Sequence, residues 1–95
     1  MAKQKSGTDT VSYMGRDYQV DRAALTSMKV NRALVNAESD MKASYDAMDA
    51  ICCGRLDEYL DVLPEPDGGV GEYGASFEAF NAFLSAAAEQ VGAKN

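Results

Sequence analysis

The segment PEPDGGVGEYGAS, residues 64–76, constrains the fold of this 95-residue chain more than any other feature. It holds both prolines and four of the eight glycines of the chain. Such a stretch favours neither helix nor strand, because proline lacks a backbone donor and glycine leaves the backbone unrestrained. The chain is therefore expected to fold as a longer N-terminal part, one long loop and a final segment.

Alternating apolar side chains predict a β-hairpin near the N-terminus. Val11 and Tyr13 precede Gly15-Arg16-Asp17, and Tyr18 and Val20 follow it. This pattern indicates two short strands joined by a three-residue loop. A hairpin alone is only marginally stable, so it must pack on helices or pair with another chain.

Helical spacing of apolar side chains predicts four helices, over about residues 22–37, 40–53, 55–63 and 77–91. Residues that commonly cap or stop helices lie at the expected ends. They are Asp21, Ser39-Asp40, Gly54, Pro64, Ser76 and Gly92. The expected core draws on Leu25, Met28, Leu34, Tyr45, Met48, Ile51, Leu56, Leu60, Leu63, Phe80, Leu84 and Val91.

The expected fold is mainly α, a small bundle of about four helices with an N-terminal β-hairpin. A single helical domain with the hairpin covers residues 11–92. A disordered N-terminal tail over residues 1–10 precedes it, and a short C-terminal tail over residues 93–95 follows it.

The adjacent pair Cys52-Cys53, just before Gly54, raises the question of a metal or redox site. Neighbouring cysteines cannot form an ordinary disulfide with each other without strain. The chain has no other cysteine and no histidine, so one chain cannot supply four zinc ligands of those types. We therefore expect one thiol in the core and the other at a helix end, which Gly54 closes in the left-handed conformation.

The sequence gives little indication of catalysis. The absence of histidine removes the commonest general base. Asp57, Glu58 and Asp61 are close together, but nothing indicates that they are desolvated, so a solvated helix face is the expected role. The GGVG of the long loop lacks the Lys-Ser/Thr of a phosphate loop. We expect no enzyme, no catalytic residue, no metal ion and no cofactor.

Charge is spread unevenly along the chain. The net charge is −6, with +3 over residues 1–32 and −9 over residues 33–95. An acidic surface repels phosphate, so nucleic-acid binding is not expected. The start MAKQKSG is polar, and no stretch approaches the roughly 20 apolar residues of a membrane helix. We expect a cytosolic protein.

Five segments in a fixed order carry a family resemblance: GRDYQVD, DRAALTSMKVNRALVNAE, DMKASYDAMDAICCG, RLDEYLDVL and SFEAFNAFLSAAAEQVGAKN. Together they resemble the small tail assembly chaperones of long-tailed bacteriophages and prophages, over about residues 11–95. The positions that matter most are Asp21, Leu25, Gly54 and the ending GAKN.

The resemblance implies a partner and a setting. Members of this family bind the tape-measure protein and keep it soluble while tail-tube subunits polymerise around it. They act in the cytoplasm of the host bacterium and are absent from the mature virion. Many are also made in a longer form by a programmed ribosomal frameshift, and the extension recruits the tail-tube protein. Codons for Ala93-Lys94-Asn95 can contain the slippery heptamer A AAA AAC.

Four aromatic side chains exceed the needs of the expected core and form the expected client surface: Tyr59, Tyr73, Phe77 and Phe83. Whether several copies assemble stays open. One alternative is a small acidic prophage regulator or inhibitor, either antitoxin-like or a mimic of nucleic acid. Another is an enzyme subunit that uses Asp57 and Asp61.

Overall fold

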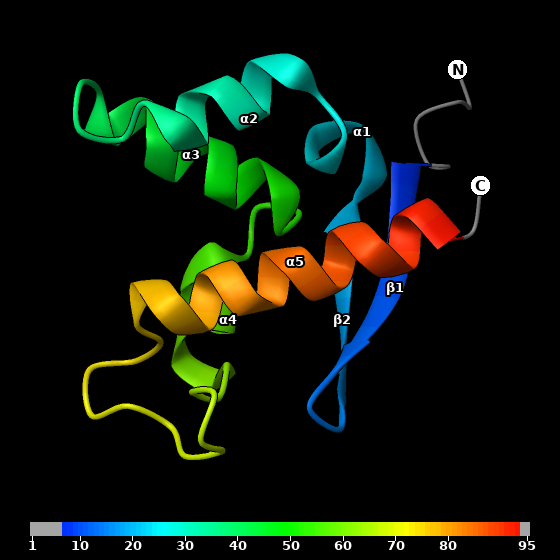
Figure 1. Ribbon diagram of the computed structural model, residues 1–95, viewed down its shortest axis with the longest axis vertical. Coiled ribbons are helices and arrows are strands. Elements are labelled where there is room, and N and C mark those ends of the chain that lie inside the picture. Colours follow the sequence, from blue (N-terminus) through cyan, green and yellow to red (C-terminus); the bar gives the residue numbers. More distant parts are fainter. Residues whose placement is uncertain (1–6, 94–95) are drawn as a thin grey trace. The chain divides into compact units, whose positions relative to one another are not determined.

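The computed structural model describes residues 7–93. Its elements, in chain order, are β1 (Thr8–Tyr13), β2 (Arg16–Asp21), α1 (Arg22–Leu25), α2 (Met28–Val35), α3 (Met41–Ile51), α4 (Leu56–Val62) and α5 (Phe77–Ala93) (Figure 1). The expectation of a mainly α protein with an N-terminal hairpin is confirmed for these residues. None of their helices is long and apolar enough to cross a membrane.

The chain forms two compact units. Within residues 7–93, one comprises residues 7–9 and Gln19–Leu56, and the other comprises Thr10–Tyr18 and residues 57–93. Most of the expected N-terminal tail, and Lys94-Asn95 of the expected C-terminal tail, lie outside the described residues. Strand β1 nevertheless begins at Thr8, inside the range expected for the first tail. The assignment of residues 11–92 to one domain stays a prediction.

The hairpin buries the apolar side chains that its alternation predicts. Val11 and Val20 are fully buried and Tyr18 nearly so. The predicted loop over residues 15–17 is wrong, because β2 already begins at Arg16. The turn consists of Met14 and Gly15, which have φ values of 49° and 85°. Two left-handed residues suit a two-residue hairpin turn, because their twist matches that of the strands.

The predicted single helix over residues 22–37 is also wrong, because the chain breaks between α1 and α2. Asp21 caps α1 as expected, since its carboxylate accepts a hydrogen bond from the Ala24 amide. Ser27 is extended and its hydroxyl accepts a bond from the Val30 amide, which makes it a second N-cap. The Asn31 side-chain amide donates to the carbonyl of Leu25, the last residue of α1, and so satisfies an acceptor at the break.

In the unit that contains residues 19–56, α3 packs against α1 and α2. Figure 1 shows α2 and α3 side by side. Asp40 caps α3 by accepting from the Ala43 amide. The buried residues of this helix are Ser44, Ala47 and Ile51. Tyr45, which was predicted to lie in the core, is exposed instead. Small side chains at Ser44 and Ala47 allow close approach of the neighbouring helices.

The turn after α3 matches the expectation for Gly54 and extends it. Gly54 has a φ of 77°, and Cys53 before it is left-handed as well, with a φ of 59°. The Gly54 amide donates to the carbonyl of Asp49 at 2.8 Å, which closes the helix end. The Asp49 carboxylate then accepts from the amide of Leu56, the first residue of α4.

The second unit is built around Phe83 of α5, which is fully buried. Its ring lies 5.1 Å from the ring of Tyr18, 5.8 Å from that of Tyr13 and 6.2 Å from that of Tyr59. These distances and the edge-on angles are those of favourable aromatic pairs. The hairpin, α4 and α5 thus share one aromatic cluster. Helix α5 continues to Ala93, so the predicted cap at Gly92 is wrong.

Half of the predicted core is buried, and the rest is not. The buried members are Leu25, Ile51, Leu56, Leu63, Phe80 and Val91. The half-buried members are Leu34, Met48, Leu60 and Leu84. Met28 and Tyr45 are exposed, so their assignment to the core is wrong. The hairpin side chains and Phe83 replace them.

We expect Phe83→Ala to destabilise the protein by about 3–5 kcal/mol, because it removes a buried ring and leaves a cavity. Phe77→Ala on the same helix is the matched control, since Phe77 is exposed and its loss should change stability by less than about 0.5 kcal/mol. Urea unfolding followed by circular dichroism measures both. Should Phe83→Ala be too unstable to fold, Phe83→Leu gives a smaller loss of about 1–2 kcal/mol. Equal effects at the two positions would contradict the described core.

Candidate protein-binding surfaces

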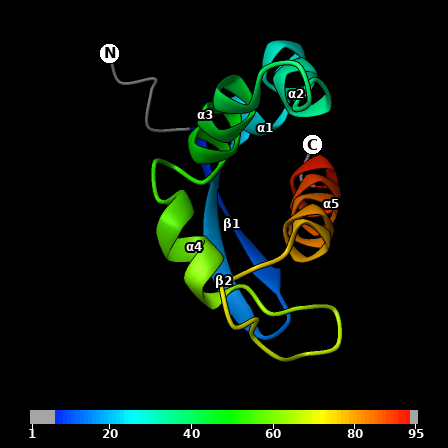
Figure 2. The ribbon, with the colours of Figure 1, turned by 90° about the vertical axis from the view of Figure 1, so that its left-hand side faces the viewer.

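The loop between α4 and α5 is held closed by Glu65. Its carboxylate accepts one hydrogen bond from the Ser76 amide, at 2.8 Å, and a second from the Ser76 hydroxyl. Its own amide donates to the carbonyl of Gly69 at 2.7 Å, and its carbonyl accepts from Gly68. Glu65 therefore joins the two ends of the long segment that leaves α4 and returns to α5 (Figure 2).

A second contact fixes the returning part of the loop to α4. The Ala75 amide donates to the carbonyl of Leu60 at 2.8 Å. Gly74 has a φ of 90°, and a Cβ atom there would lie 2.9 Å from the same carbonyl oxygen. Only glycine fits this position without a shift of the backbone. The glycines that rule out regular structure therefore allow a defined loop.

Three exposed apolar side chains lie in or directly after the closed loop, and we call them the loop surface: Val70 and Tyr73 in the loop and Phe77 at the start of α5. Tyr73 is 95% exposed, Phe77 73% and Val70 59%. The Ser76 hydroxyl also accepts from the Ala79 amide, so it caps α5 just after the loop. Because hydrogen bonds hold the backbone at both ends, these side chains are exposed on an ordered support.

The four aromatic residues expected to bind a client separate into two pairs. Tyr73 and Phe77 belong to the loop surface, whereas Tyr59 is 4% exposed and Phe83 is not exposed at all. The idea that Tyr59 and Phe83 exceed the needs of the core is wrong, because both rings pack on Tyr18. Sequence reasoning did not single out Val70, although its position among glycines, away from any periodic segment, was an available signal.

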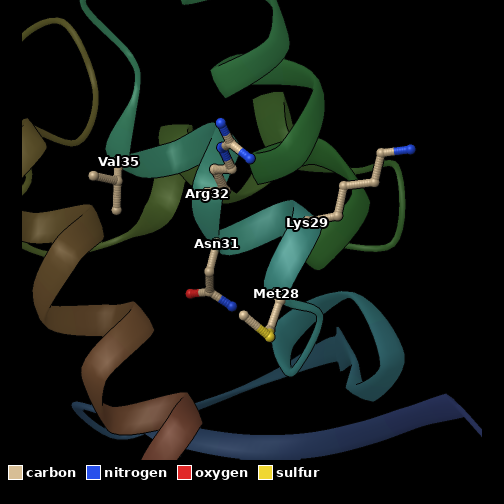
Figure 3. Close-up of a pocket in the computed structure, with 5 residues that line it drawn as sticks. All are labelled: Met28, Lys29, Asn31, Arg32 and Val35. Carbon is tan, nitrogen blue, oxygen red and sulfur yellow. The ribbon is translucent and has the colours of Figure 1, made fainter.

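A second exposed apolar surface lies on α2, which we call the α2 face: Met28, Lys29, Asn31, Arg32 and Val35. These residues line an open hollow of about 600 Å³. Figure 3 shows Met28 and Asn31 projecting from one side of the helix, with Lys29 extended away from it. No residue of α2 is buried. The sequence reading missed this surface because it placed Met28 in the core.

The two cysteines have the structural role that their spacing predicts. Cys52 is fully buried and Cys53 is half-buried. Burial raises the pKa of the Cys52 thiol to about 12, and the neighbouring Asp49 carboxylate adds to the effect. Burial also raises the pKa of Cys53, against a smaller lowering by Arg55. Both thiols are protonated near neutral pH, which makes them weak nucleophiles.

The acidic residues of α4 do not form a closed site. Asp57 and Asp61 are both exposed, as expected for a solvated helix face. Within residues 7–93, no three or more of the histidine, cysteine, aspartate and glutamate side chains are grouped so that they could hold a metal ion. Comparison with protein-family models, curated proteins and solved structures gives no match to this chain. The loop surface and the α2 face are therefore the candidate binding sites among the described residues.

We expect Glu65→Ala to open the loop without unfolding the protein. Removal of the two bonds to Ser76 should cost about 1 kcal/mol locally, because the carboxylate is partly solvated. Hydrogen exchange at the Ser76 amide and proteolysis within residues 66–75 should become about fivefold faster.

Glu72→Ala is the matched control for that experiment, because it removes a carboxylate of the same loop that is exposed. It should leave both rates unchanged. If the two variants behave alike, the Glu65–Ser76 contact does not hold the loop.

Proposed function

We propose that this protein is a tail assembly chaperone of a long-tailed bacteriophage or prophage. It binds the tape-measure protein and keeps it soluble while the tail tube assembles. It acts in the cytoplasm of the host bacterium and is absent from the mature virion. The proposal rests on the resemblance of residues 11–95 to that family and on one structural observation, the ordered loop surface.

The loop surface suits a client that is rich in exposed apolar helix. Tyr73 and Phe77 offer large rings with few rotatable bonds, so little conformational entropy is lost when a partner covers them. Aromatic side chains are also enriched at protein interfaces. The net charge of −6 opposes association between copies that expose such side chains. A small protein can thus expose apolar groups and stay dispersed.

Acidic side chains are close in sequence to the residues of the loop surface. Asp67 and Glu72 lie in the loop and Glu78 follows Phe77, and all three are exposed. A client helix that carries basic residues beside its apolar stripe would meet both kinds of contact. If the protein were instead an acidic inhibitor that mimics nucleic acid, that role would explain only the carboxylates. It would leave the exposure of Tyr73 and Phe77 unexplained, so we favour the chaperone.

Co-expression with the tape-measure protein of the phage or prophage that encodes this chain tests the proposal. The wild-type chain should increase the soluble fraction of that protein severalfold and should co-purify with it. The double variant Tyr73→Ser/Phe77→Ser should lose most of this effect while its own stability changes little, because both side chains are exposed.

The matched control is Met41→Ser/Tyr45→Ser, which removes two exposed apolar side chains from α3. It should behave as the wild type does. A soluble fraction that does not respond to the wild-type chain would rule out the chaperone function. An equal loss in both double variants would rule out the loop surface as the client site.

The proposal includes a longer product made by ribosomal frameshifting, which would recruit the tail-tube protein. Expression of the native gene with its downstream DNA and an N-terminal tag should yield a minor band above the main one. Silent recoding of Ala93-Lys94-Asn95 should remove that band, because the slippery heptamer is lost while the protein is unchanged. A single short band from the native gene would exclude the frameshift.

A further inference from the structure

Helix α2 turns two of its apolar side chains outward, whereas Leu34 is half-buried. Met28 is 88% exposed and Val35 is 82% exposed. They are seven residues apart, and Asn31 and Arg32 fall between them on the same face of the helix. A helix of a single folded unit usually directs its apolar stripe to the core. The exposed stripe of α2 therefore indicates that something outside the unit covers it.

The charges on the α2 face are of one sign. Lys29 and Arg32 are three residues apart and both are exposed, and α2 contains no carboxylate. Two like charges at this spacing destabilise a helix by a few tenths of a kcal/mol, about as much as an opposite pair stabilises it. Arg32 is favoured by its position in the last turn, near the negative end of the helix dipole. Lys29 in the first turn has no such compensation.

The backbone under the α2 face is already in place. Ser27 caps the first turn, and the Asn31 side-chain amide donates to the carbonyls of Leu25 and Ser27. A partner would bind a helix that is already formed, so this chain loses little conformational entropy on binding.

The shape of the hollow suggests a helical partner. Its volume, about 600 Å³, would admit a row of side chains, and the lining residues that the structure describes lie on α2. An open surface along one helix is the usual seat for the apolar face of an amphipathic helix. Lys29 and Arg32 beside Met28 and Val35 would pair with carboxylates that flank such an apolar stripe.

We propose that the α2 face binds an acidic amphipathic helix of a different protein. Leucine-like side chains of that helix would cover Met28 and Val35, and its carboxylates would contact Lys29 and Arg32. The inference does not depend on the chaperone function or on the loop surface. It would give the chain a second docking surface, with charge opposite to that around the first.

A second copy of this chain fits the α2 face less well. Its acidic helix α4 buries Leu56 and Tyr59, and α5 buries Phe80 and Phe83. Neither of these helices could offer an apolar stripe together with its carboxylates unless it left its own core. Helix α3 exposes Met41 and Tyr45, but its Asp46 carboxylate is already paired with Lys42 at 2.8 Å. The occupant is therefore assigned to another protein.

Three synthetic peptides of about 18 residues, long enough to form a helix, test the inference. The first has leucine at helical spacing flanked by glutamate. The second has lysine in place of each glutamate, and the third has the composition of the first in scrambled order. Fluorescence anisotropy with the full chain should show binding of the first peptide alone. Binding should weaken strongly between about 0.05 M and about 0.5 M salt.

Two pairs of variants separate the α2 face from the rest of the surface. Arg32→Glu should weaken binding about tenfold or more, whereas Arg16→Glu, the same charge change in the hairpin, should change it by less than about twofold. Val35→Ser should weaken binding about fivefold, whereas Val70→Ser on the loop surface should have no effect. All four side chains are exposed, so folding should be preserved.

Three results would overturn the inference. The first is that the acidic amphipathic peptide does not bind, or binds no better than the basic or scrambled peptide. The second is that each variant equals its control. The third is a dimer of the chain, seen by light scattering, that Arg32→Glu dissociates. The variant Tyr73→Ser/Phe77→Ser leaves the α2 face intact, so it should still bind the acidic peptide even if it no longer binds the tape-measure protein. Peptide binding by this variant therefore tests the α2 face separately from the proposed function.

Discussion

The ring of Phe83 is the contact on which the second unit depends. Tyr13 and Tyr18 from the hairpin, Tyr59 from α4 and Phe80 from α5 all place their rings within 6.2 Å of it, between ring centres. Elements that are far apart in the sequence thereby acquire fixed positions. A chain of 95 residues buries only a modest core, so one fully buried ring is a large share of its stability.

The loop surface follows from this cluster. Helices α4 and α5 are held by Tyr59 and Phe83, and the two ends of the long loop are therefore near each other. Glu65 and Ser76 then close the loop, and Gly74 lets it pass against the end of α4. Buried aromatic residues thus support exposed ones.

Capping residues made much of the fold predictable. Asp21, Asp40 and Ser76 each accept a bond from the backbone amide three residues later, as the sequence indicates. The break at Ser27 escaped prediction because the apolar spacing continues through it. Only the hydroxyl of Ser27 and the side chain of Asn31 mark the new helix, and both residues also occur within unbroken helices.

Which face of a helix is buried was less predictable than where the helix begins. Size favours Tyr45 over Ser44 and Ala47 as a core residue of α3, yet the small residues are the buried ones. Close contact with α1 and α2 decides this, and no spacing rule contains that contact. The same difficulty applies to the candidate site. Tyr73 and Phe77 were predicted as client residues because they exceed the needs of the expected core, whereas Met28 continues a helical pattern and was assigned to the core.

The central claim is that Phe83 holds a frame from which the loop surface contacts a client. Amide NMR of the isotope-labelled chain, titrated with a segment of the tape-measure protein, tests this most directly. The account predicts shifts or broadening over Val70–Phe77, with the amides of Tyr59 and Phe83 keeping their hydrogen-exchange protection. Loss of protection at Tyr59 and Phe83 on binding would contradict it, because the client would then be taking apart the core.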